Sequence, residues 1–344
     1  MLKVIHKPIV IIGAGPSGTT CGYLLAKAGY DCTIIDKVKF PRDKTCGGGL
    51  TPKAHKLVND IFGDIEYEYL PVRKMEFHTA KGIFASFELN PEIRNVVRED
   101  FDEILLEEYV KVGGKLLTTR IRKIREKNGK SFLYLDDKSV ISCDILVGAD
   151  GANSFVRKYL KLVYPKTLLM MEKKNNDRSI SDIIIYFDKK YDGGYTYVFP
   201  NMKKNIVGYG HMNATVNEFG EEIGRFGLNP EGKTKGAYIP AYESFKYPFR
   251  KTIILIGDAG GYVDSVTGEG LYYALKTGQN AAISIIEGRD FKDVNKSMIR
   301  RVKRLNRIAR IFYNRAFQNL FYRICSTKFL HPWLTKIANY YVAR

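Results

Sequence analysis

The chain has 344 residues, 45% of them hydrophobic and 27% charged, a length and composition typical of a soluble globular protein with a large core. Its five cysteines show neither metal-ligand spacing nor a disulfide framework, and no apolar run approaches the ~18 residues of a membrane-spanning helix. These features argue against a metal site and against membrane-spanning helices, and we expect a cytoplasmic protein with reduced thiols.

A βαβ unit opens the chain over residues 7–37, where two apolar runs flank a glycine turn and a helical stretch. The turn carries a complete GxGxxG motif formed by Gly13, Gly15 and Gly18. Such glycines allow the N-terminus of the following helix to approach a pyrophosphate, and Asp36 ends the second run where an acid can bind a ribose hydroxyl. Because strand, helix, strand and acid occur in order, the segment predicts a dinucleotide-binding site.

The next segment, FPRDKTCGGGLTP at 40–52, places Cys46 before three glycines without a CxxC partner, so neither a zinc site nor a disulfide explains it. Further along, residues 72–89 have the pattern of a β-hairpin. The stretch that follows predicts a helix that ends near Gly113 and then a strand.

The middle of the chain predicts a second sheet. A buried strand within 143–160 ends at Asp150, and from about Tyr164 to Phe249 aromatic and β-branched residues alternate with glycine turns. The expected strands there are SDIIIYFD, GYTYVFP and NIVGYGHM. Residues 250–288 then return to a buried strand, a glycine-rich loop and a helix of small residues, after which the sequence is helical.

No internal repeat or linker separates these parts, so we expect interleaved domains in an α/β fold whose second domain is α+β. The expected boundaries are 1–70 with 96–160 and 250–290 for a Rossmann-type nucleotide-binding domain, 71–95 with 161–249 for an antiparallel-sheet substrate domain, and 291–344 for basic C-terminal helices.

The C-terminal tail carries much of the net charge of +18, because residues 289–344 hold 14 Lys or Arg against two Asp. Apolar residues recur there at helical spacing: Ile299, Val302, Leu305, Ile308, Ile311 and Phe312. Basic residues fill much of the remaining circumference: Arg300, Arg301, Lys303, Arg304, Arg307 and Arg310. Such a helix either covers a domain or lies on an anionic bilayer, and we expect both roles together. The aromatic residues expected to meet lipid headgroups are Phe317, Phe321, Tyr322 and Trp333, and no nucleic acid is expected as a partner.

Three glycine-acid signatures stand in order along the chain: GxGxxG, GADGANSFVR at 148–157 and IGDAGG at 256–261. Together they resemble the FAD-dependent flavoproteins of the para-hydroxybenzoate hydroxylase type over nearly all of the first 290 residues. The resemblance implies that the first signature holds the AMP pyrophosphate of FAD and that Asp258 of the third accepts a hydrogen bond from a ribityl hydroxyl. It also implies that Arg98 lies near the flavin, although a surface charge at a helix end would give the same sequence.

Four further stretches are similar to the geranylgeranyl reductase family, whose members saturate prenyl double bonds: KTCGGGL, GYTYVFP, NIVGYG and TGEGLYYAL. The chain departs from that family's usual pattern at Tyr197, where a tryptophan is usual, and at Ser265, where a proline is usual. Flavin halogenases share the fold but carry a tryptophan pair, whereas the one tryptophan here is Trp333. The resemblance implies a reductase of a prenylated lipid, peripherally associated with the membrane, that takes electrons from NAD(P)H or a reduced ferredoxin.

Reduction of an isolated prenyl double bond requires an acid as well as a hydride. Tyr195, Tyr197 and Phe199 alternate along one strand, so their side chains share a face. An aromatic core stripe has the same pattern, but with the family resemblance we expect this face to line the pocket and to stabilise developing positive charge.

In the fold that the resemblance implies, the segment with Cys46 passes the flavin ring and the thiol faces the substrate. The thiol then either shapes the pocket, relays a proton or fills space, and a water beside it is an equal candidate for the acid. Residues 268–270 open a helix aimed at the flavin, and we expect Glu269 to orient that loop rather than to act as the acid.

The residues expected to bind the cofactor are Gly13, Gly15, Gly18, Asp36, Lys37, Cys46, Gly47, Arg98, Asp150, Gly257, Asp258, Gly268, Glu269 and Gly270. Those expected to bind the substrate are Tyr195, Tyr197, Phe199 and Pro200, and those expected to act in catalysis are Cys46, Tyr195 and Tyr197. Two other functions stay open: a flavin-dependent monooxygenase of a hydrophobic aromatic or quinone substrate, and a flavin-containing protein that binds lipid or nucleic acid.

Overall fold

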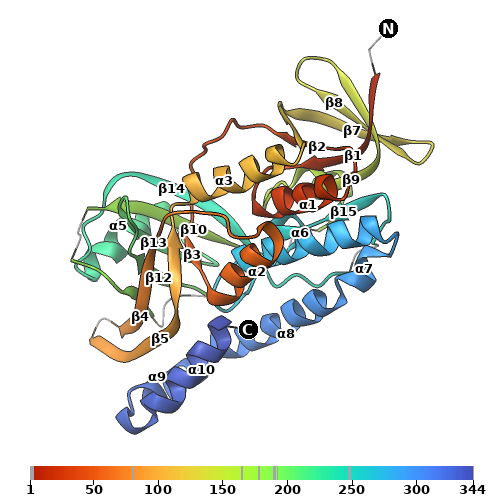
Figure 1. Ribbon diagram of the computed structural model, residues 1–344. Helices are drawn as coiled ribbons and strands as arrows, with labels where there is room; N and C mark the ends of the chain where they lie inside the picture. The colour runs from red at the N-terminus through yellow and green to blue at the C-terminus, as the bar shows by residue number, and fades with distance from the viewer. Residues whose placement is uncertain are drawn as a thin grey trace.

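The computed structural model describes residues 4–79, 81–163, 166–176, 179–188, 191, 193–246 and 249–343. Two sheets lie side by side, and helices from the N-terminal and C-terminal parts of the chain run along both (Figure 1). The expected α/β class with a second, mostly antiparallel sheet is confirmed.

The first sheet has seven strands in the order β6-β2-β1-β9-β8-β7, with β15 paired to β9. Its strands are β1 (Val4–Ile12), β2 (Cys32–Asp36), β6 (Lys115–Thr118), β7 (Ile121–Lys127), β8 (Lys130–Leu135), β9 (Val140–Gly148) and β15 (Ile253–Leu255). β1, β2, β6, β9 and β15 are parallel, as the βαβ pattern of residues 7–37 predicts for β1 and β2. The antiparallel hairpin of β7 and β8 is an addition that the sequence pattern did not reveal.

Helices α1 (Pro16–Lys27), α3 (Arg98–Lys111) and α6 (Leu271–Ile286) pack together in the main core over this sheet. The packing is close because small residues lie at the contact. A Cβ on Gly278 of α6 would come within 2.4 Å of the Ser17 carbonyl oxygen of α1. The short helix α4 (Phe155–Tyr159) and the hairpin share a smaller core with the strands.

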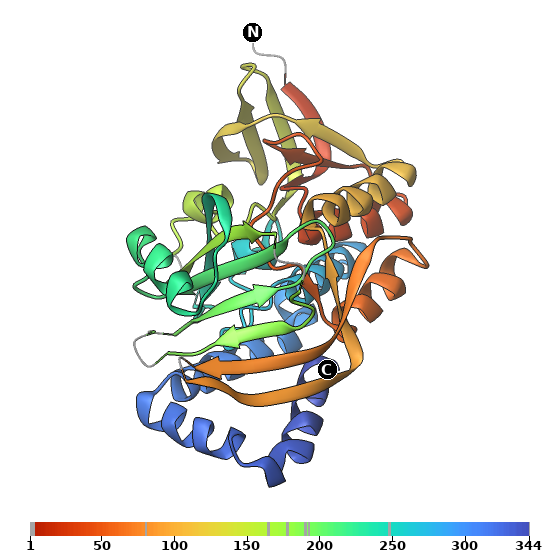
Figure 2. The same ribbon diagram turned by 90° about the vertical axis from the view of Figure 1, so that its left-hand side faces the viewer.

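The second sheet has eight strands in the order β14-β10-β13-β12-β11-β4-β5-β3 (Figure 2). They are β3 (Gly49–Leu50), β4 (Tyr69–Thr79), β5 (Gly82–Val96), β10 (Lys166–Asn175), β11 (Ile183–Tyr186), β12 (Tyr195–Phe199), β13 (Asn205–His211) and β14 (Glu231–Ala241). Neighbours are antiparallel except β4 and β11. Helix α5 (Val216–Arg225) covers one face, and the other face looks toward the first sheet and the C-terminal helices. Helix α2 (Pro52–Phe62) follows β3.

The C-terminal segment consists of α7 (Phe291–Val294), α8 (Lys296–Phe312), α9 (Arg315–Cys325), the 3-10 turn η2 (Lys328–Leu330) and α10 (His331–Ala343). Another 3-10 turn, η1 (Gly257–Gly260), precedes α6. The views in Figures 1 and 2 agree that α9 and α10 lie at the end of the molecule opposite to β7 and β8. Of the described helices, none is long and apolar enough to cross a bilayer.

The predicted apolar stripe of α8 is correct except at two positions, and its last residue, Phe312, packs against Phe187 and Phe321. Ile299, Val302 and Leu305 are buried, whereas Ile308 and Ile311 are 43% and 57% exposed. The reason is that the inward face continues through Asn306, whose amide donates to the Glu243 carbonyl oxygen at 2.8 Å, and through a buried alanine one turn later.

Three basic or aromatic side chains of this segment, which we expected to face outward, are turned toward the protein instead. Arg301 turns inward, where its Nε donates to the Tyr273 hydroxyl at 3.1 Å. Phe321 and Tyr322 pack against phenylalanines of the β4–β5 hairpin instead of facing outward. They do so because α9 lies against β5, which buries one face of that helix.

Candidate active site

A cavity of about 1150 Å³ lies between the two sheets. At one end it is lined by the loop between β1 and α1, and at the other by β10, β12 and β14 of the second sheet. Because single-ligand pockets usually measure about 300–1,000 Å³, this cavity has room for a large cofactor and a second molecule beside it.

The first end of the cavity has the features of an anion site. Helix α1 begins directly after Gly15, with no side-chain cap and no acid in its first turn, so its first N–H groups have no side-chain acceptor. A Cβ on Gly15 would meet only Arg42 Nη2, at 3.3 Å. Gly13 has φ +106°, and a Cβ there would lie 2.4 Å from the Ala149 carbonyl oxygen. Gly13 therefore requires glycine in the folded protein, whereas the absence of a side chain at Gly15 keeps the space in front of α1 open as a cradle.

Gly18 has a different role. It is not among the lining residues, and a Cβ on it would lie 1.9 Å from the Gly13 carbonyl oxygen. Its absence of a side chain lets α1 pack against β1. The third glycine of the motif therefore positions the helix without touching the cavity.

Charged groups surround this cradle. Asp36, at the end of β2, accepts hydrogen bonds from Ala14 N at 2.8 Å and Val38 N at 3.0 Å, and Lys37 beside it also lines the cavity. Arg42, which sequence analysis missed, lies over the Phe40 ring and is 3.3 Å from Asp102 Oδ2. Its position beside Gly15 brings a guanidinium to the anion site.

Arg98 is buried and lines the cavity, so it is not a surface charge at a helix end. Its Nε and Nη2 donate to the two carboxylate oxygens of Asp102 at 2.8 and 2.9 Å. This bidentate contact fixes the guanidinium plane beside Cys46, whose side chain also interacts with it.

The three glycines after Cys46 are explained by what they touch. A Cβ on Gly47 or Gly49 would meet the Phe199 ring at 2.8 or 2.9 Å, and Gly48 has φ +83° with the Val96 carbonyl oxygen 2.2 Å from the position of a Cβ. The loop thus passes between β12 and β5. Its Cys46 thiol lines the cavity and accepts a hydrogen bond from Gly48 N at 3.4 Å.

Tyr195, Tyr197 and Phe199 all line the cavity as one aromatic wall, with successive ring centroids 5.9 and 5.3 Å apart. The Tyr195 hydroxyl donates to the Thr267 carbonyl oxygen, and the Tyr197 hydroxyl donates to Glu172 Oε1. Gly208 on β13 makes the second contact possible, because a Cβ there would lie 2.0 Å from the Tyr197 ring.

Glu172 was missed by sequence analysis. It lies on β10, is 7% exposed and lines the cavity. Burial raises the pKa of its carboxyl to about 7, although the Tyr197 hydroxyl, the Cys46 backbone N–H and the charges of Lys44 and Arg98 act in the opposite direction. The sequence did carry a signal for it. Leu168, Met170 and Glu172 lie on the same face of β10, so an acid follows two apolar residues on a buried face.

The loop before α6 is held by a buried ion pair. Lys53 Nζ lies 2.8 Å from Glu269 Oε2, and Thr51 Oγ1 donates to Glu269 Oε1 at 2.6 Å. Ser265, where the similar family usually has proline, donates to Asn306 Oδ1 at 2.7 Å and so ties the loop to α8. Glu269 is therefore engaged with α2, in keeping with an orienting role.

Helix α6 begins after Gly270, which lines the cavity with Gly268, and it too has no side-chain cap and no acid in its first turn. Asp258 lies beside this helix start. Burial raises the pKa of its carboxyl, and no described residue donates a hydrogen bond to that carboxylate. A polar ligand in the cavity can therefore accept hydrogen bonds from the first N–H groups of α6 and donate one to the Asp258 carboxylate.

Three other expected residues contribute differently. The Asp150 carboxylate accepts from Ser154 Oγ at 2.5 Å and Phe155 N at 2.6 Å, so it caps α4. Gly257 and Pro200 are not among the lining residues. Gly257 has φ +54° and donates from its N–H to Thr277 Oγ1 at 2.9 Å, while the Pro200 carbonyl oxygen accepts from Asn95.

These residues fit FAD. The uncapped start of α1 and the Gly15 cradle suit its pyrophosphate, and Asp258 with the uncapped start of α6 suits its ribityl chain and ring. The part of the cavity beside Cys46 and the aromatic wall is then left for a second molecule.

The chain is similar to known proteins in sequence and in fold. Residues 6–177 match the family of the FAD binding domain. Geranylgeranyl diphosphate reductase of Rhodobacter capsulatus is 29% identical over 299 residues, which cover 79% of this chain and 73% of that protein. Menaquinone reductase of Mycolicibacterium smegmatis is 26% identical over 333 residues, which cover 81% of this chain and 76% of that protein. A solved structure of a geranylgeranyl bacteriochlorophyll reductase-like protein of Thermoplasma acidophilum matches with a TM-score of 0.79 and 18% identity, over 95% of this chain and 93% of that chain, a likeness of fold.

Proposed function

The chain belongs to the FAD binding domain family and is an FAD-dependent oxidoreductase related to the geranylgeranyl reductases, and we propose on this basis that it reduces carbon–carbon double bonds in the prenyl chain of a lipid. One observation carries the proposal. Beyond the FAD cradle the cavity continues along the aromatic wall and an apolar lining that includes Met75, Ile93 and Ile239. Such a lining suits a hydrocarbon chain and excludes water from it.

Each group of lining residues has a role in this reaction. Reduced FAD supplies a hydride when it is bound. The aromatic wall holds the double bond and stabilises the positive charge that develops on a tertiary carbon, because π faces attract cations in a dry site. Cys46 precedes Gly47, which packs against the Phe199 ring, and its thiol shapes the pocket between the wall and the FAD cradle.

Anaerobic turnover tests the proposal. Holoprotein reduced with dithionite is mixed with geranylgeranyl diphosphate or a menaquinone, and mass spectrometry measures the gain of two hydrogens for each saturated bond. We expect saturation without oxygen, whereas a monooxygenase requires oxygen, and hydroxylated product formed only in air would overturn the proposal.

A substitution in the aromatic wall tests whether the wall contacts the substrate or only supports the fold. Tyr197→Ala should lower turnover by at least about tenfold, because it removes both a π face and a hydroxyl contact. Tyr134→Ala on β8, outside the cavity, is the matched control. Unchanged turnover of the Tyr197 variant would remove the wall from the substrate site.

The electron donor is proposed to bind transiently, because the sequence carries no second GxGxxG motif for a separate nucleotide domain. NADH, NADPH and reduced ferredoxin can each be mixed anaerobically with the oxidised holoprotein. Bleaching of the flavin absorbance identifies the donor.

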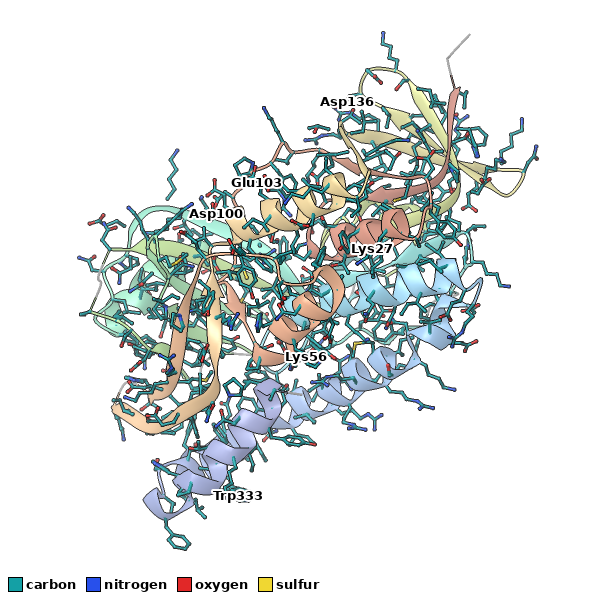
Figure 3. The ribbon with its side chains drawn as sticks, viewed as in Figure 1. Lys27, Lys56, Asp100, Glu103, Asp136 and Trp333 are labelled. Carbon is teal, nitrogen blue, oxygen red and sulfur yellow. The ribbon has the colours of Figure 1, made fainter. Side chains whose placement is uncertain are left out.

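We also propose that the C-terminal helices bring the cavity to an anionic membrane surface. Helix α10 lies along β5, and its Tyr341 and Val342 line the cavity. The other side of the same helix exposes Trp333 and Tyr340 by 58% and 60%, and Trp333 points away from both sheets (Figure 3). Aromatic side chains of this kind favour the headgroup region of a bilayer.

The neighbouring surface is basic and apolar together. Arg300, Lys303, Arg304, Arg307 and Arg310 of α8 are exposed. Leu320 of α9 and Phe329 of η2 are 53% and 90% exposed. A prenylated lipid could therefore pass from the bilayer along α10 into the cavity, with no transmembrane segment required.

Cosedimentation with phosphatidylglycerol vesicles, with phosphatidylcholine vesicles as control, tests this surface at low and high salt. Because a basic group near an anionic surface contributes about 1 kcal/mol, Arg304→Ala with Arg307→Ala should weaken binding about 30-fold. Lys123→Ala with Lys127→Ala, two exposed lysines of β7 at the end of the molecule far from α9 and α10, is the matched control. Binding that ignores lipid charge and salt would refute the membrane role, and tight salt-sensitive binding to nucleic acid would favour the third function instead.

A further inference from the structure

Glu172, Gly208 and Tyr197 lie side by side on three neighbouring strands of the second sheet. Glu172 of β10 pairs with Gly208 of β13, and Gly208 pairs with Tyr197 of β12. Because Gly208 has no side chain, the Tyr197 ring lies over it and its hydroxyl reaches the Glu172 carboxyl. The result is a continuous polar path from a buried acid to the aromatic wall.

We propose that Glu172 holds the proton that is delivered to the substrate double bond, and that it delivers this proton through the Tyr197 hydroxyl. This inference rests on the proposed function. When Glu172 is protonated, its carboxyl O–H donates to Tyr197 Oη, the reverse of the hydrogen bond that the tyrosine donates to the carboxylate. In the step, Tyr197 Oη gives its proton to one carbon of the double bond and takes the proton of the Glu172 carboxyl. The other carbon receives the hydride of reduced FAD, so the double bond gains two electrons and the flavin loses them. Glu172 is left as a carboxylate, which water reprotonates for the next turnover.

Other ionisable groups of the cavity are less suited to this step. Burial raises the pKa of the Glu269 and Asp150 carboxyls as well. Glu269 is held by Lys53 and Thr51, however, and Asp150 accepts from Ser154 Oγ and the first N–H groups of α4, so neither is hydrogen-bonded to the aromatic wall. Tyr195 donates to the Thr267 carbonyl oxygen, which cannot return a proton to it, whereas Tyr197 contacts a carboxyl that can. Asp258 lies at the start of α6 on the FAD side.

The surroundings of Glu172 are compatible with a proton held near neutral pH. Burial raises the pKa of its carboxyl to about 7. The groups that face it are Tyr197 from β12, Cys46 and Lys44 from the glycine loop, and Arg98 from α3. The adjacent strand β14 pairs Lys235 with Glu172, but the ammonium of that lysine contacts Asp43. The acid therefore has no basic side chain in direct contact among the described residues.

The first measurement needs no turnover. Infrared difference spectra of oxidised holoprotein across a pH titration should show a protonated carboxyl band that disappears around pH 7. The band should be absent in Glu172→Gln and retained in Glu222→Gln. Glu222 is the matched control because it is a buried acid that accepts a hydrogen bond from another tyrosine, Tyr191, outside the cavity. Absence of such a band from the wild-type protein overturns the inference.

The second measurement follows reoxidation of pre-reduced FAD by geranylgeranyl diphosphate without oxygen. The wild-type rate should fall as pH rises through about 7. Glu172→Gln should be slower by at least about 100-fold with little pH dependence, because a positioned acid typically contributes that much, while FAD content stays normal. Tyr197→Phe should lose the same pH dependence but keep the infrared band.

The outcomes distinguish the two proposals. Wild-type protein that saturates no prenyl probe overturns the proposed function. Wild-type turnover with an unchanged rate and pH profile in Glu172→Gln overturns the assignment of Glu172 alone. A slow Glu172→Gln variant with a wild-type pH profile also overturns it, because a merely structural role would lower the rate without moving the profile.

Discussion

Substitution of Gly15 by valine should weaken FAD binding strongly while the protein still folds. Gly15 has φ −73° and ψ 175°, an extended conformation that valine also adopts. A Cβ there faces the cavity, and its one near neighbour is the flexible end of Arg42 at 3.3 Å. The main cost to stability is at the start of α1, where valine is a poorer N-cap than glycine by up to about 1 kcal/mol.

The cost to FAD binding is larger. The valine methyl groups occupy the space in front of the first N–H groups of α1, which have no other acceptor from a side chain. Hydrogen bonds to a charged group contribute about 1.5–3 kcal/mol each, so the loss of two contacts amounts to about 3–6 kcal/mol. FAD should therefore bind roughly 10²- to 10⁴-fold more weakly.

Flavin absorbance of the purified protein and fluorescence titration of the apoprotein measure the affinity, and circular dichroism follows thermal unfolding. Gly18→Ala is the contrasting variant, because its Cβ would lie 1.9 Å from the Gly13 carbonyl oxygen and would force α1 away from β1. It should lose about 1–3 kcal/mol of stability or more. A folded Gly15→Val protein that retains stoichiometric FAD would refute the assignment of the cradle, and an unfolded one would refute the reasoning about its free space.

Three further predictions concern the other side of the cavity. Cys46→Ala should keep FAD but lose about tenfold in olefin reduction, since a shifted pocket wall misplaces the substrate; normal turnover would reduce Cys46 to packing. Lys53→Met should lower the free energy of unfolding by about 3–5 kcal/mol in urea titrations, because it leaves Glu269 buried and unpaired; adding Glu269→Gln should restore part of that loss, and additive effects would contradict the pairing. Burial raises the pKa of Glu172 from 4.5 to about 7, so between these pH values the folded state holds a proton that the unfolded state releases. The free energy of unfolding should therefore fall by about 3 kcal/mol as pH rises from 4.5 to 7. Glu172→Gln should remove this fall, and parallel stability profiles of the two proteins between pH 4.5 and 7 would contradict it.

Much of the FAD-binding part could be predicted from sequence because its determinants are local. The βαβ unit over 7–37 is specified by an apolar run, a glycine turn, a helical stretch and Asp36, all within one supersecondary unit. The alternation of Tyr195, Tyr197 and Phe199 likewise requires only the period of a strand. The α/β class, the second sheet and the relation to geranylgeranyl reductases were predicted correctly in this way.

The tertiary structure decided which distant groups meet, because local patterns carry no information about such pairs. Glu172 meets Tyr197 across a strand whose glycine leaves room, and Lys53 meets Glu269 from more than 200 residues away. Each contact depends on strand register or helix packing.

The same reason explains the errors in the C-terminal segment. Sequence periodicity gave α8 an apolar stripe, but the rotation of that helix is set by what it packs against. Asn306 faces inward because Ser265 and a backbone carbonyl satisfy its amide, and Arg301 faces inward because the Tyr273 hydroxyl accepts its hydrogen bond. Ile308 and Ile311 are left exposed as a consequence. Sequence alone therefore predicted the βαβ unit with its glycine turn and the second sheet, whereas packing decided the acid beside the aromatic wall and the face that the tail presents to solvent.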